Sequence, residues 1–409
     1  MTPPALRLVN LRTHPSHEST ETLLIENGQF VHTLSAPDVE TIDLGGCLVI
    51  PGLIETHLHL DKACILNRCC LDEGTLAEAI AQTRHAKTAF TEEDIYARGA
   101  IVLEKAIGHG TTFIRTHVEI DPGIGLTGFN AILRLQADYA WAVTLQICVF
   151  PQEGLLNNPG TEALLRQALD MGADVLGGCP YMDSDPQGQI ERLFDIAVAH
   201  DCDLDFHLDF DLDPHGMTVP DVIRCTRKYD WTGRVTIGHA TKLSALSPEA
   251  LSMIAAEMAN AGVNLTCLPS TDLFLTARDR LLDKPRGVVP LAALHRHGVT
   301  CSISTNNIGN PFTPYGDASL VRQANLFANV TQLGTPAELL LCLNWISWTS
   351  AQLLRLTDYG LKPGCRADFV VFDAPSPDAI VAEIQAPIMG FKAGRQTFHR
   401  PTVKLLRPL

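Results

Sequence analysis

The stretch Pro51-Gly-Leu-Ile-Glu-Thr-His-Leu-His-Leu-Asp-Lys62 gives the strongest indication of the fold and of the site. Its first two residues are a turn signal, and the apolar run that follows predicts a β-strand over residues 53–60. His57 and His59 are two positions apart, so both rings lie on one face of that strand. Their nitrogens can then converge on one cation as the first two ligands of a divalent metal. The alternative is a half-buried strand with two incidental histidines.

A strand followed by a helix is the repeating unit of the middle of the chain. The expected strands cover residues 53–60, 111–120, 142–150, 173–181, 204–211, 234–240, 264–270 and 299–306. Helical patterns lie between them, for example over 92–109, 160–171, 189–200 and 248–261, and several end at a glycine. Parallel strands need crossover connections of helix length, so this rhythm over about 300 residues predicts a (β/α)8 barrel.

The two ends of the chain have a different pattern. Short alternating runs at residues 5–10, 21–26 and 29–33 read as strands, and Asn27-Gly28 between two of them is a hairpin signal. The same character returns at residues 367–373 and 388–394. We therefore expect one small β-rich domain, made of residues 1–50 together with 360–409, beside a barrel of residues 51–359.

Chemistry in such a barrel collects at the carboxyl ends of the strands. The polar residues expected there are His57, His59, His117, Glu119, Gln152, His207, Asp209, Asp211, His239, Asn306 and Asn307. His57, His59 and His207 can form a three-nitrogen metal site that leaves positions open for water and substrate. His239 is a further ligand, a group that polarises the bond under attack, or a core histidine. His117 is favoured as structural, because charged neighbours can pair with it.

Composition narrows the class of protein. The 409 residues are 46% hydrophobic and carry a net charge of -15, which argues against nucleic acid or an anionic membrane surface as partner. Twelve cysteines without a CxxC pair indicate reduced thiols. The start of the chain has no signal-peptide pattern, and its most apolar helical stretch is too short and polar to span a bilayer. We expect a cytoplasmic protein without a membrane segment.

Further motifs follow in a fixed order along the chain. They are Arg115-Thr-His-Val-Glu119, Val149-Phe-Pro-Gln-Glu-Gly154, Phe206-His-Leu-Asp209, Gly238-His239, Asn306-Asn-Ile-Gly-Asn-Pro-Phe312 and Gly360-Leu-Lys-Pro-Gly-Cys-Arg-Ala-Asp-Phe-Val-Val-Phe-Asp373. With the first stretch they resemble the amidohydrolase superfamily, and within it the cytosine deaminase branch. The resemblance covers essentially the whole chain. It implies an α/β fold, a (β/α)8 TIM-type barrel with a small β-sandwich domain built from both termini. It also implies one divalent metal, Zn or Fe, a small nitrogen heterocycle as partner, and a homo-oligomer.

The resemblance also assigns residues. It implies that His57, His59 and His207 bind the metal, with His239 beside the metal-bound hydroxide. The residues that would hold the ring are Gln152, Asn307, Phe312 and Lys62. The pattern His-x-His-x-Asp-Lys is more similar to N-isopropylammelide isopropylaminohydrolase, an s-triazine enzyme of the same branch. Lys62 would hold an anionic or carbonyl-rich ring, or it forms a salt bridge to Asp61 or another carboxylate.

Two positions depart from the family pattern. Family members carry an Asp after strand eight that ligates the metal and accepts a proton, and this chain has Asn306 there. Cytosine deaminases carry a Glu three residues after the strand-five histidine, where this chain has Phe210. Loss of one such base costs on the order of 10²–10⁴-fold in rate. Three explanations remain open: an engineered replacement of an aspartate at 306, proton transfer by Asp209, Asp211 or His239, or a site that only binds its ligand. Asp209 and Asp211 follow His207 by two and four positions, so strand alternation places both on its face.

The expected function is an aminohydrolase acting on C–N bonds other than peptide bonds. Metal-bound hydroxide would attack a ring carbon of a cytosine-like pyrimidine or an s-triazine, releasing ammonia or an amine. Binuclear relatives carry a carboxylated lysine on strand four, and residues 173–181 contain no lysine, which favours a single metal. The alternatives are a catalytically silenced heterocycle-binding protein and a cyclic-amide hydrolase.

Overall fold

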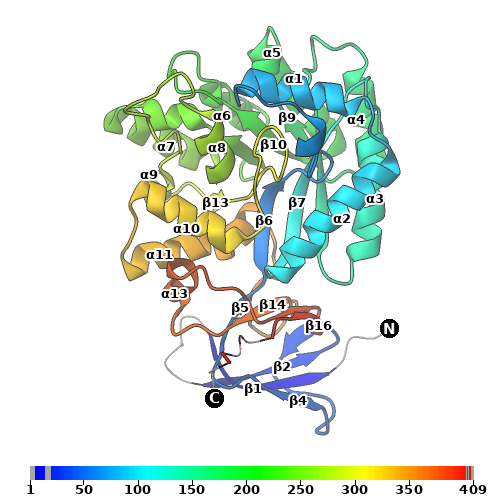
Figure 1. The fold of residues 1–409 in the computed structure, drawn as a ribbon, viewed down its shortest axis with the longest axis vertical. Coiled ribbons are helices and arrows are strands. Elements are labelled where there is room, and N and C mark those ends of the chain that lie inside the picture. The colour runs from blue at the N-terminus through cyan, green and yellow to red at the C-terminus, as the bar shows by residue number, and fades with distance from the viewer. Residues whose placement is uncertain (1–4, 14–19, 402, 404, 407–409) are drawn as a thin grey trace.

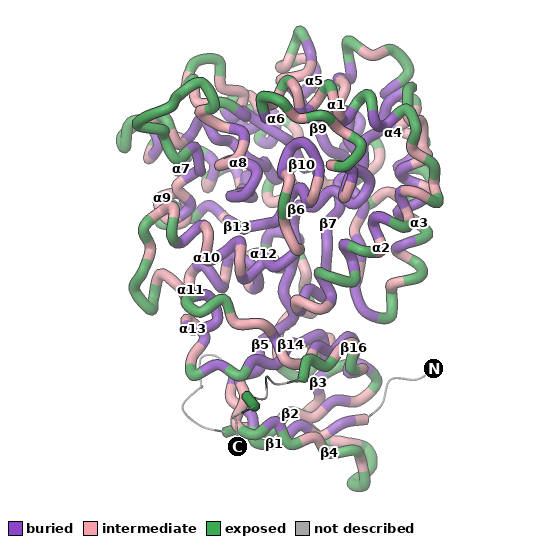
Figure 2. The backbone as a smooth tube through the Cα atoms, viewed as in Figure 1, coloured by how far each residue is buried: buried purple, intermediate pink, exposed green. Residues whose placement is uncertain are grey.

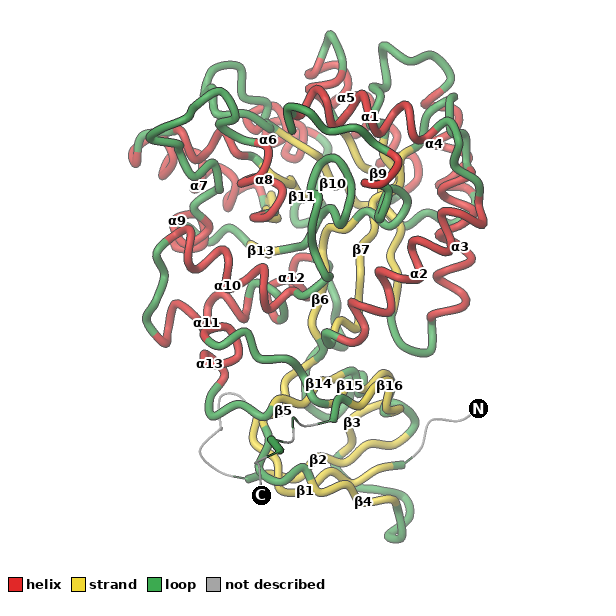
Figure 3. Tube along the Cα trace, in the orientation of Figure 1, coloured by secondary structure: helices red, strands yellow, loops and turns green. Residues whose placement is uncertain are grey.

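The computed structural model describes residues 5–13, 20–401, 403 and 405–406 of the chain. Two sheets organise these residues, one forming the barrel in the upper part of Figure 1 and the other lying below it. Helices surround the upper sheet, whereas the lower region is built almost entirely of strands and loops (Figure 3). The expected α/β class, with a barrel and a small β domain from both termini, is confirmed.

Eight parallel strands form the barrel in sequence order. They are β6 (Leu53–Leu58), β7 (Thr111–Glu119), β8 (Thr144–Phe150), β9 (Val175–Gly178), β10 (Asp203–Leu208), β11 (Val235–His239), β12 (Val263–Cys267) and β13 (Cys301–Ile303). Each expected strand is present, though most are shorter than predicted. A parallel bridge between Leu58 and Asn306 brings the first and last strands together. The barrel therefore closes at the point where the conspicuous histidines lie.

The helices cover the outside of the barrel. They are α1 (Leu76–Lys87), α2 (Glu92–Gly108), α3 (Thr127–Tyr139), α4 (Thr161–Asp170), α5 (Pro186–His200), α6 (Val219–Lys228), α7 (Pro248–Ala261), α8 (Pro269–Leu275), α9 (Leu291–Arg296), α10 (Leu320–Thr331), α11 (Pro336–Asn344), α12 (Trp348–Leu353) and α13 (Pro377–Ala382). The predicted glycine stops hold, for example at Gly110 and Gly262, which have φ angles of 88° and 69°. Figure 2 shows the barrel strands buried and the outer helical faces exposed.

The second sheet joins the two ends of the chain. Its strand order is β16-β15-β14-β5-β1-β2-β3, with β4 beside β1. The strands are β1 (Leu6–Thr13), β2 (Glu21–Glu26), β3 (Gln29–Val31), β4 (Glu40–Asp43), β5 (Leu48–Pro51), β14 (Phe369–Phe372), β15 (Met389–Lys392) and β16 (Arg395–His399). The predicted hairpin at Asn27-Gly28 is confirmed, with Glu26 opposite Gln29. The strand expected over 388–394 is present as β15 but ends at Lys392, because Ala393 and Gly394 adopt positive φ and turn the chain into a second hairpin.

The small β domain lies at the amino ends of the barrel strands. The chain passes from β5 to β6 through Gly52 alone, where a Cβ would clash with Thr112 at the start of β7. Nζ of Lys392 donates to the carbonyl of Thr112 at 3.0 Å, which fastens β15 to the same end of the barrel. The carboxyl ends of the barrel strands therefore face away from this domain, as Figure 1 shows.

The expected domain boundaries at residues 50 and 360 stay a prediction. Of the residues assigned to the small β domain, 1–4, 14–19, 402, 404 and 407–409 lie outside the described residues. No helix among the residues that the structure describes is long and apolar enough to cross a membrane.

Candidate active site

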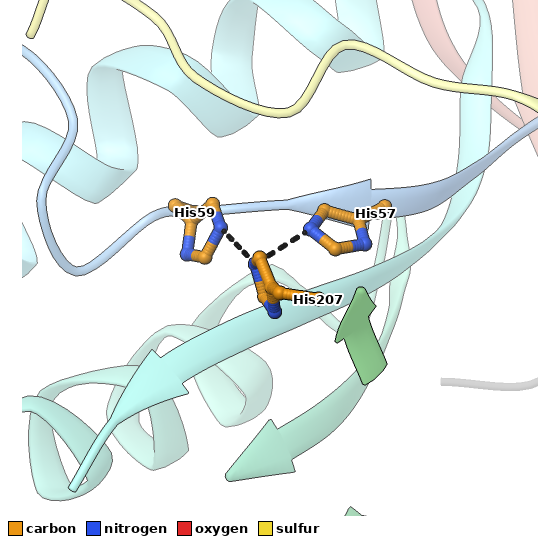
Figure 4. A group of neighbouring side chains, drawn as sticks. All are labelled: His57, His59 and His207. Atoms are coloured by element: carbon orange, nitrogen blue, oxygen red, sulfur yellow. Dashed lines mark hydrogen bonds between the residues drawn. The ribbon is translucent and has the colours of Figure 1, made fainter. Parts of the chain in front are cut away.

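Three imidazole rings meet at the carboxyl ends of two barrel strands. His57 lies in β6, His59 follows the end of β6, and His207 comes from β10 (Figure 4). Nε2 of His207 lies 3.1 Å from Nε2 of His57 and 3.1 Å from Nε2 of His59. All three rings are buried. The structure thus brings together the three residues that the sequence proposes as ligands.

These histidines are neutral. Burial lowers the pKa of each ring well below its ordinary value, and the neighbouring histidines add repulsion between like charges. The charge of Lys62 has the same effect on the pKa of His59. A neutral imidazole keeps a lone pair on one ring nitrogen, which is the form that binds a metal. Three such lone pairs facing one another repel unless a cation or a shared proton lies between them.

Asn306 completes this side of the site. The backbone of Asn306 lies between those of His57 and His59. Its N–H donates to the carbonyl of His57 and its carbonyl accepts from the N–H of His59, both at 2.9 Å. Its Oδ1 is buried without a hydrogen-bond partner. An unsatisfied buried oxygen beside three imidazole nitrogens fits a divalent cation as the missing partner. The oxygen belongs to an amide, so it brings no negative charge and cannot accept a proton at neutral pH.

His239 has a partner that the sequence did not reveal. Nδ1 of His239 lies 2.7 Å from Oδ1 of Asp272, which comes from α8 after the seventh barrel strand. Burial raises the pKa of this carboxyl above its ordinary value, although His239 acts in the opposite direction. Nε2 of His239 lies 3.5 Å from Nδ2 of Asn306. The carboxyl of Asp272 therefore fixes the ring, with Nε2 turned toward the candidate metal ligands.

Asp209 does not share the face of His207, contrary to the sequence expectation. The strand ends at Leu208, and Asp209 has a φ of 50°, so the two-residue alternation stops before it. Its carboxylate accepts instead from the N–H and hydroxyl groups of Thr218 and from the N–H of Val219, at 2.8–3.1 Å. Those contacts anchor the start of α6, so Asp209 is turned away from the histidines.

The next two positions, Phe210 and Asp211, place no acidic group at the histidines either. Asp211 pairs with Lys242 at 3.2 Å and is half exposed, outside the histidine cluster. Phe210 packs edge-to-face against His239, with ring centroids 4.4 Å apart. An apolar ring therefore stands where cytosine deaminases would carry a glutamate.

Lys62 is the only described cationic side chain that lines the cavity over the histidines. Its Nζ lies 2.7 Å from Oε1 of Glu119 and 3.5 Å from Oε1 of Gln152, and it sits 4.5 Å from the centre of the Phe312 ring. Although burial acts to raise it, the charges of Lys62 and Lys87 lower the pKa of Glu119 to about 2. The sequence left two alternatives for Lys62, a contact with the ring or a salt bridge. The structure contains the salt bridge, which is buried and formed with Glu119.

Asn310 orients the loop that carries Asn307 and Phe312. Its Nδ2 donates to Oδ1 of Asn307 at 2.8 Å and to the carbonyl of Lys62 at 3.2 Å. Its Oδ1 accepts from the N–H groups of Phe312 and Thr313. Asn310 is part of a quoted motif, but the sequence analysis assigns it no role.

These side chains surround one narrow cavity. Its lining contains eight residues predicted from the sequence: His59, Lys62, Gln152, His207, His239, Asn306, Asn307 and Phe312. It also contains Leu76, Tyr181, Phe210, Thr271 and Leu275. No aspartate or glutamate is among these described lining residues. Leu76 could not be identified from the sequence. It is the first residue of α1, and the position of that helix over the barrel is defined only in the folded chain.

Known proteins share this architecture over nearly the whole chain. N-isopropylammelide isopropyl amidohydrolase of Pseudomonas sp. strain ADP is 25% identical over 370 residues, covering 87% of each chain. Pterin deaminase of Rhizobium rhizogenes is 26% identical over 383 residues, covering 91% of this chain and 87% of its own. The crystal structure of 5-methylcytosine deaminase from Klebsiella pneumoniae with 5-fluorocytosine superposes with a TM-score of 0.93, at 26% identity over 98% of this chain and 99% of its own.

A second solved structure is N-isopropylammelide isopropylaminohydrolase from Burkholderia multivorans, with a TM-score of 0.86 and 28% identity over 98% of this chain and 99% of its own. The family model described as the amidohydrolase family matches residues 73–398, which is most of the chain. The chain therefore belongs to the amidohydrolase family.

Proposed function

We propose that this chain is a metal-dependent aminohydrolase that removes ammonia or an amine from a small nitrogen heterocycle, such as a cytosine-like pyrimidine or an s-triazine. The observation that carries the proposal is the convergence of three neutral imidazole nitrogens at a narrow cavity. The names of the similar proteins support it, since they describe deaminases and an aminohydrolase of nitrogen heterocycles.

The candidate ligand set suits one divalent cation, zinc or iron. A cation held by His57, His59 and His207 would activate a water molecule for attack on a ring carbon. Asn306 adds a neutral oxygen at the same point, so the residues that face the cation carry no charge. Asp209 has no part in this proposal, because its carboxylate is bonded to the start of α6.

His239 is the group that we assign to proton transfer. Its Nδ1 is held by Asp272, which leaves the lone pair of Nε2 toward Asn306 and the cavity. A positioned histidine of this kind contributes about 10²–10⁴-fold to a rate, which is enough to replace one missing carboxylate base. The role falls to His239 because the other residues considered, Asp209 and Asp211, face elsewhere.

The opposite wall suits a ring with carbonyl oxygens. The ammonium group of Lys62 lies there with the amide side chains of Asn307 and Gln152, and none of the described lining residues is a carboxylate. A cationic ring would meet the Lys62 charge without an anionic partner in the lining. Phe312, beneath the Lys62 ammonium, adds an apolar ring face on which a flat heterocycle can pack.

Ammonia or amine release from a panel of heterocycles tests this function. The panel contains cytosine, isoguanine, creatinine and s-triazines, and the proteins compared are the chain as given, Asn306→Asp, and Asn307→Asp as a matched control. All three are loaded with the same metal and matched in metal content. The control adds the same carboxylate one residue away, on the wall that holds the ring.

We expect the chain as given to turn over at least one panel member, and Asn306→Asp to be faster by up to about 10²–10⁴-fold. Turnover by Asn306→Asp alone would replace the proposal with a silenced, ligand-binding protein. Opening of a cyclic amide without amine release would favour the cyclic-amide hydrolase. An absence of turnover by every protein on every compound would contradict the aminohydrolase assignment.

A further inference from the structure

A second polar layer lies beneath the three histidines, inside the barrel. Arg115 and His117 come from β7 and Asp205 comes from β10, and all three are almost completely buried. Asp205 precedes His207 by two positions in the same strand, so both side chains point into the barrel at successive levels. The deamination proposed above uses none of these three residues.

Asp205 is fixed on one side only. Its Oδ2 accepts from the Arg115 guanidinium at 2.7 Å, and the same guanidinium is held by Oε1 of Gln146 at 2.8 Å. Its Oδ1 is buried and has no hydrogen-bond partner. That oxygen lies 4.0 Å from Nδ1 of His57 and 3.5 Å from Nε2 of His117. One carboxylate oxygen is thus left between the ring of His117, which is the nearer, and the back of the candidate metal ligand His57.

His117 holds the ring of His57 in place. The two rings stack with centroids 3.7 Å apart and an interplanar angle of 22°. Burial lowers the pKa of His117, so its ring is neutral and stacks without repelling a neighbouring cation. The stack therefore holds the plane of the His57 ring, in which Nδ1 lies on the side of Asp205.

The tautomer of His57 follows from its candidate role. A neutral imidazole that gives the lone pair of Nε2 to a cation must carry its proton on Nδ1, and that proton needs an acceptor. Nδ1 of His57 has no hydrogen-bond partner in the described structure, and Oδ1 of Asp205 is an unpartnered acceptor beside it. A shift of about an ångström in either side chain would join the two atoms.

We infer that Asp205, anchored by Arg115, is a positioning residue that receives the Nδ1 proton of His57 and directs Nε2 of that ring at the metal. The inference rests on the metal site of the proposed function. Asp205, His57 and His117 also form a group close enough to hold a cation of its own. The guanidinium of Arg115 already supplies the positive charge there, which argues against a second metal.

The role has particular weight in this chain. The four groups that face the candidate metal are three neutral imidazoles and an amide, so none of them carries a negative charge. A carboxylate that polarises one imidazole from behind raises the basicity of that ligand. Asp205 therefore supplies part of the negative character that an aspartate at position 306 would give directly.

Zinc affinity of the metal-free protein tests the inference without using turnover. Asp205→Asn keeps the shape of the side chain and removes its charge, and we expect zinc to bind about 10–100-fold more weakly in competition with a chelator. Asp183→Asn is the matched control, because Asp183 is also a buried, multiply hydrogen-bonded aspartate, but it holds the 155–157 segment and α5. We expect the control to keep wild-type zinc affinity.

The outcomes separate the two proposals. Wild-type protein that binds no zinc or iron would overturn the metal site itself, and with it the proposed function. Tight binding by the wild type and equal binding by Asp205→Asn would overturn only the role of Asp205. Thermal melting of the metal-free proteins provides the structural readout, since a purely structural Asp205 would lower the melting temperature and leave zinc affinity unchanged.

A measurement on the wild type covers the case in which Asp205→Asn does not fold. In zinc-loaded protein labelled with ¹⁵N-histidine, we expect the His57 ring, recognised by its contacts with His117, to carry its proton on Nδ1. That proton should exchange slowly with solvent and resonate downfield, as a proton donated to a buried carboxylate does. A proton on Nε2 of His57 would overturn the inference.

Discussion

The two walls of the cavity differ in how they handle charge. The histidine wall consists of His59, His207, His239 and Asn306, with His57 beneath them. The lysine wall consists of Lys62, Gln152, Asn307 and Phe312. On the first wall, burial keeps the rings of His59 and His207 neutral and Asn306 contributes an amide, whereas the second wall contains a buried ammonium group. Both walls are built from the carboxyl ends of barrel strands and the segments that follow them.

The difference separates reaction from recognition. On the histidine wall, carboxylates stand behind the rings, so Asp272 contacts His239 and Asp205 faces His57 without lining the cavity. On the lysine wall, the charge of Lys62 is already compensated by Glu119, which Lys87 also contacts at 2.9 Å. A cation therefore has an obvious place only on the histidine wall, and a ring with carbonyl groups only on the lysine wall.

Removing a candidate ligand should have the largest effect on this contrast. In His207→Ala the remaining nitrogens, from His57 and His59, come from one strand alone, and two ligands hold a catalytic metal poorly. We expect metal content to fall well below one ion per chain and activity to fall to background. Elemental analysis after dialysis measures the first. Full metal content in His207→Ala would show that the cation binds elsewhere.

Asp272→Asn should affect the rate but not the metal. Without the carboxylate, the ring of His239 loses the partner that fixes its tautomer, and we expect kcat to fall by about 10²-fold or more. Metal content should stay at the wild-type value, because Asp272 contacts no candidate ligand directly. Steady-state kinetics beside elemental analysis checks both points. An unchanged kcat would remove His239 from proton transfer.

Lys62→Met should lower the free energy of unfolding, because it removes one of the buried charges of the lysine wall. The substitution leaves Glu119 buried with one fewer cation, and breaking such a pair costs about 3–5 kcal/mol. Urea unfolding of the metal-free protein measures this loss. Arg84→Ala is the control, because Arg84 pairs with Glu153 at the surface, where a salt bridge contributes about 0–1 kcal/mol. Equal losses in the two variants would mean that Lys62 and Glu119 are solvated.

Phe312→Leu should give the smallest change. The ring lies 4.5 Å from Nζ of Lys62, and such a contact contributes about 1–2 kcal/mol when it is shielded from water. Leucine keeps most of the apolar volume, so we expect KM to rise by about fivefold or more, with kcat within twofold of the wild type. A change in kcat alone would place Phe312 on the reacting side of the cavity.

Periodicity in the sequence was sufficient to predict the barrel and to place the histidines at the ends of its strands, whereas the residues expected to hold the ring came from the family resemblance. The two-residue spacing of His57 and His59 holds although β6 ends at Leu58, because the N–H of His59 still bonds to the carbonyl of Asn306 and the backbone does not turn through a positive φ there. The same rule gave a wrong orientation for Asp209, because β10 ends at Leu208 and the backbone then turns through a positive φ. Alternation predicts which face a side chain occupies only while the backbone stays extended.

Partners that come from different strands could not be predicted in this way. Asp272 and His239 lie 33 positions apart, and their contact depends on how the short helix α8 follows β12. Arg115 and Asp205 are 90 positions apart and meet only because the barrel closes around them. Glu119 was recognised as a strand-end residue, but its pairing with Lys62 and Lys87 was not.

The sequence by itself determined the strand–helix order, the faces of the regular strands and the residue types at their ends, because these follow from local periodicity and turn chemistry. The tertiary structure alone decided which of those residues face one another. Nitrogens 148 and 150 positions apart come within 3.1 Å because eight strands close into a barrel. The pKa values of the histidines are likewise set by burial, and burial belongs to the folded chain as a whole.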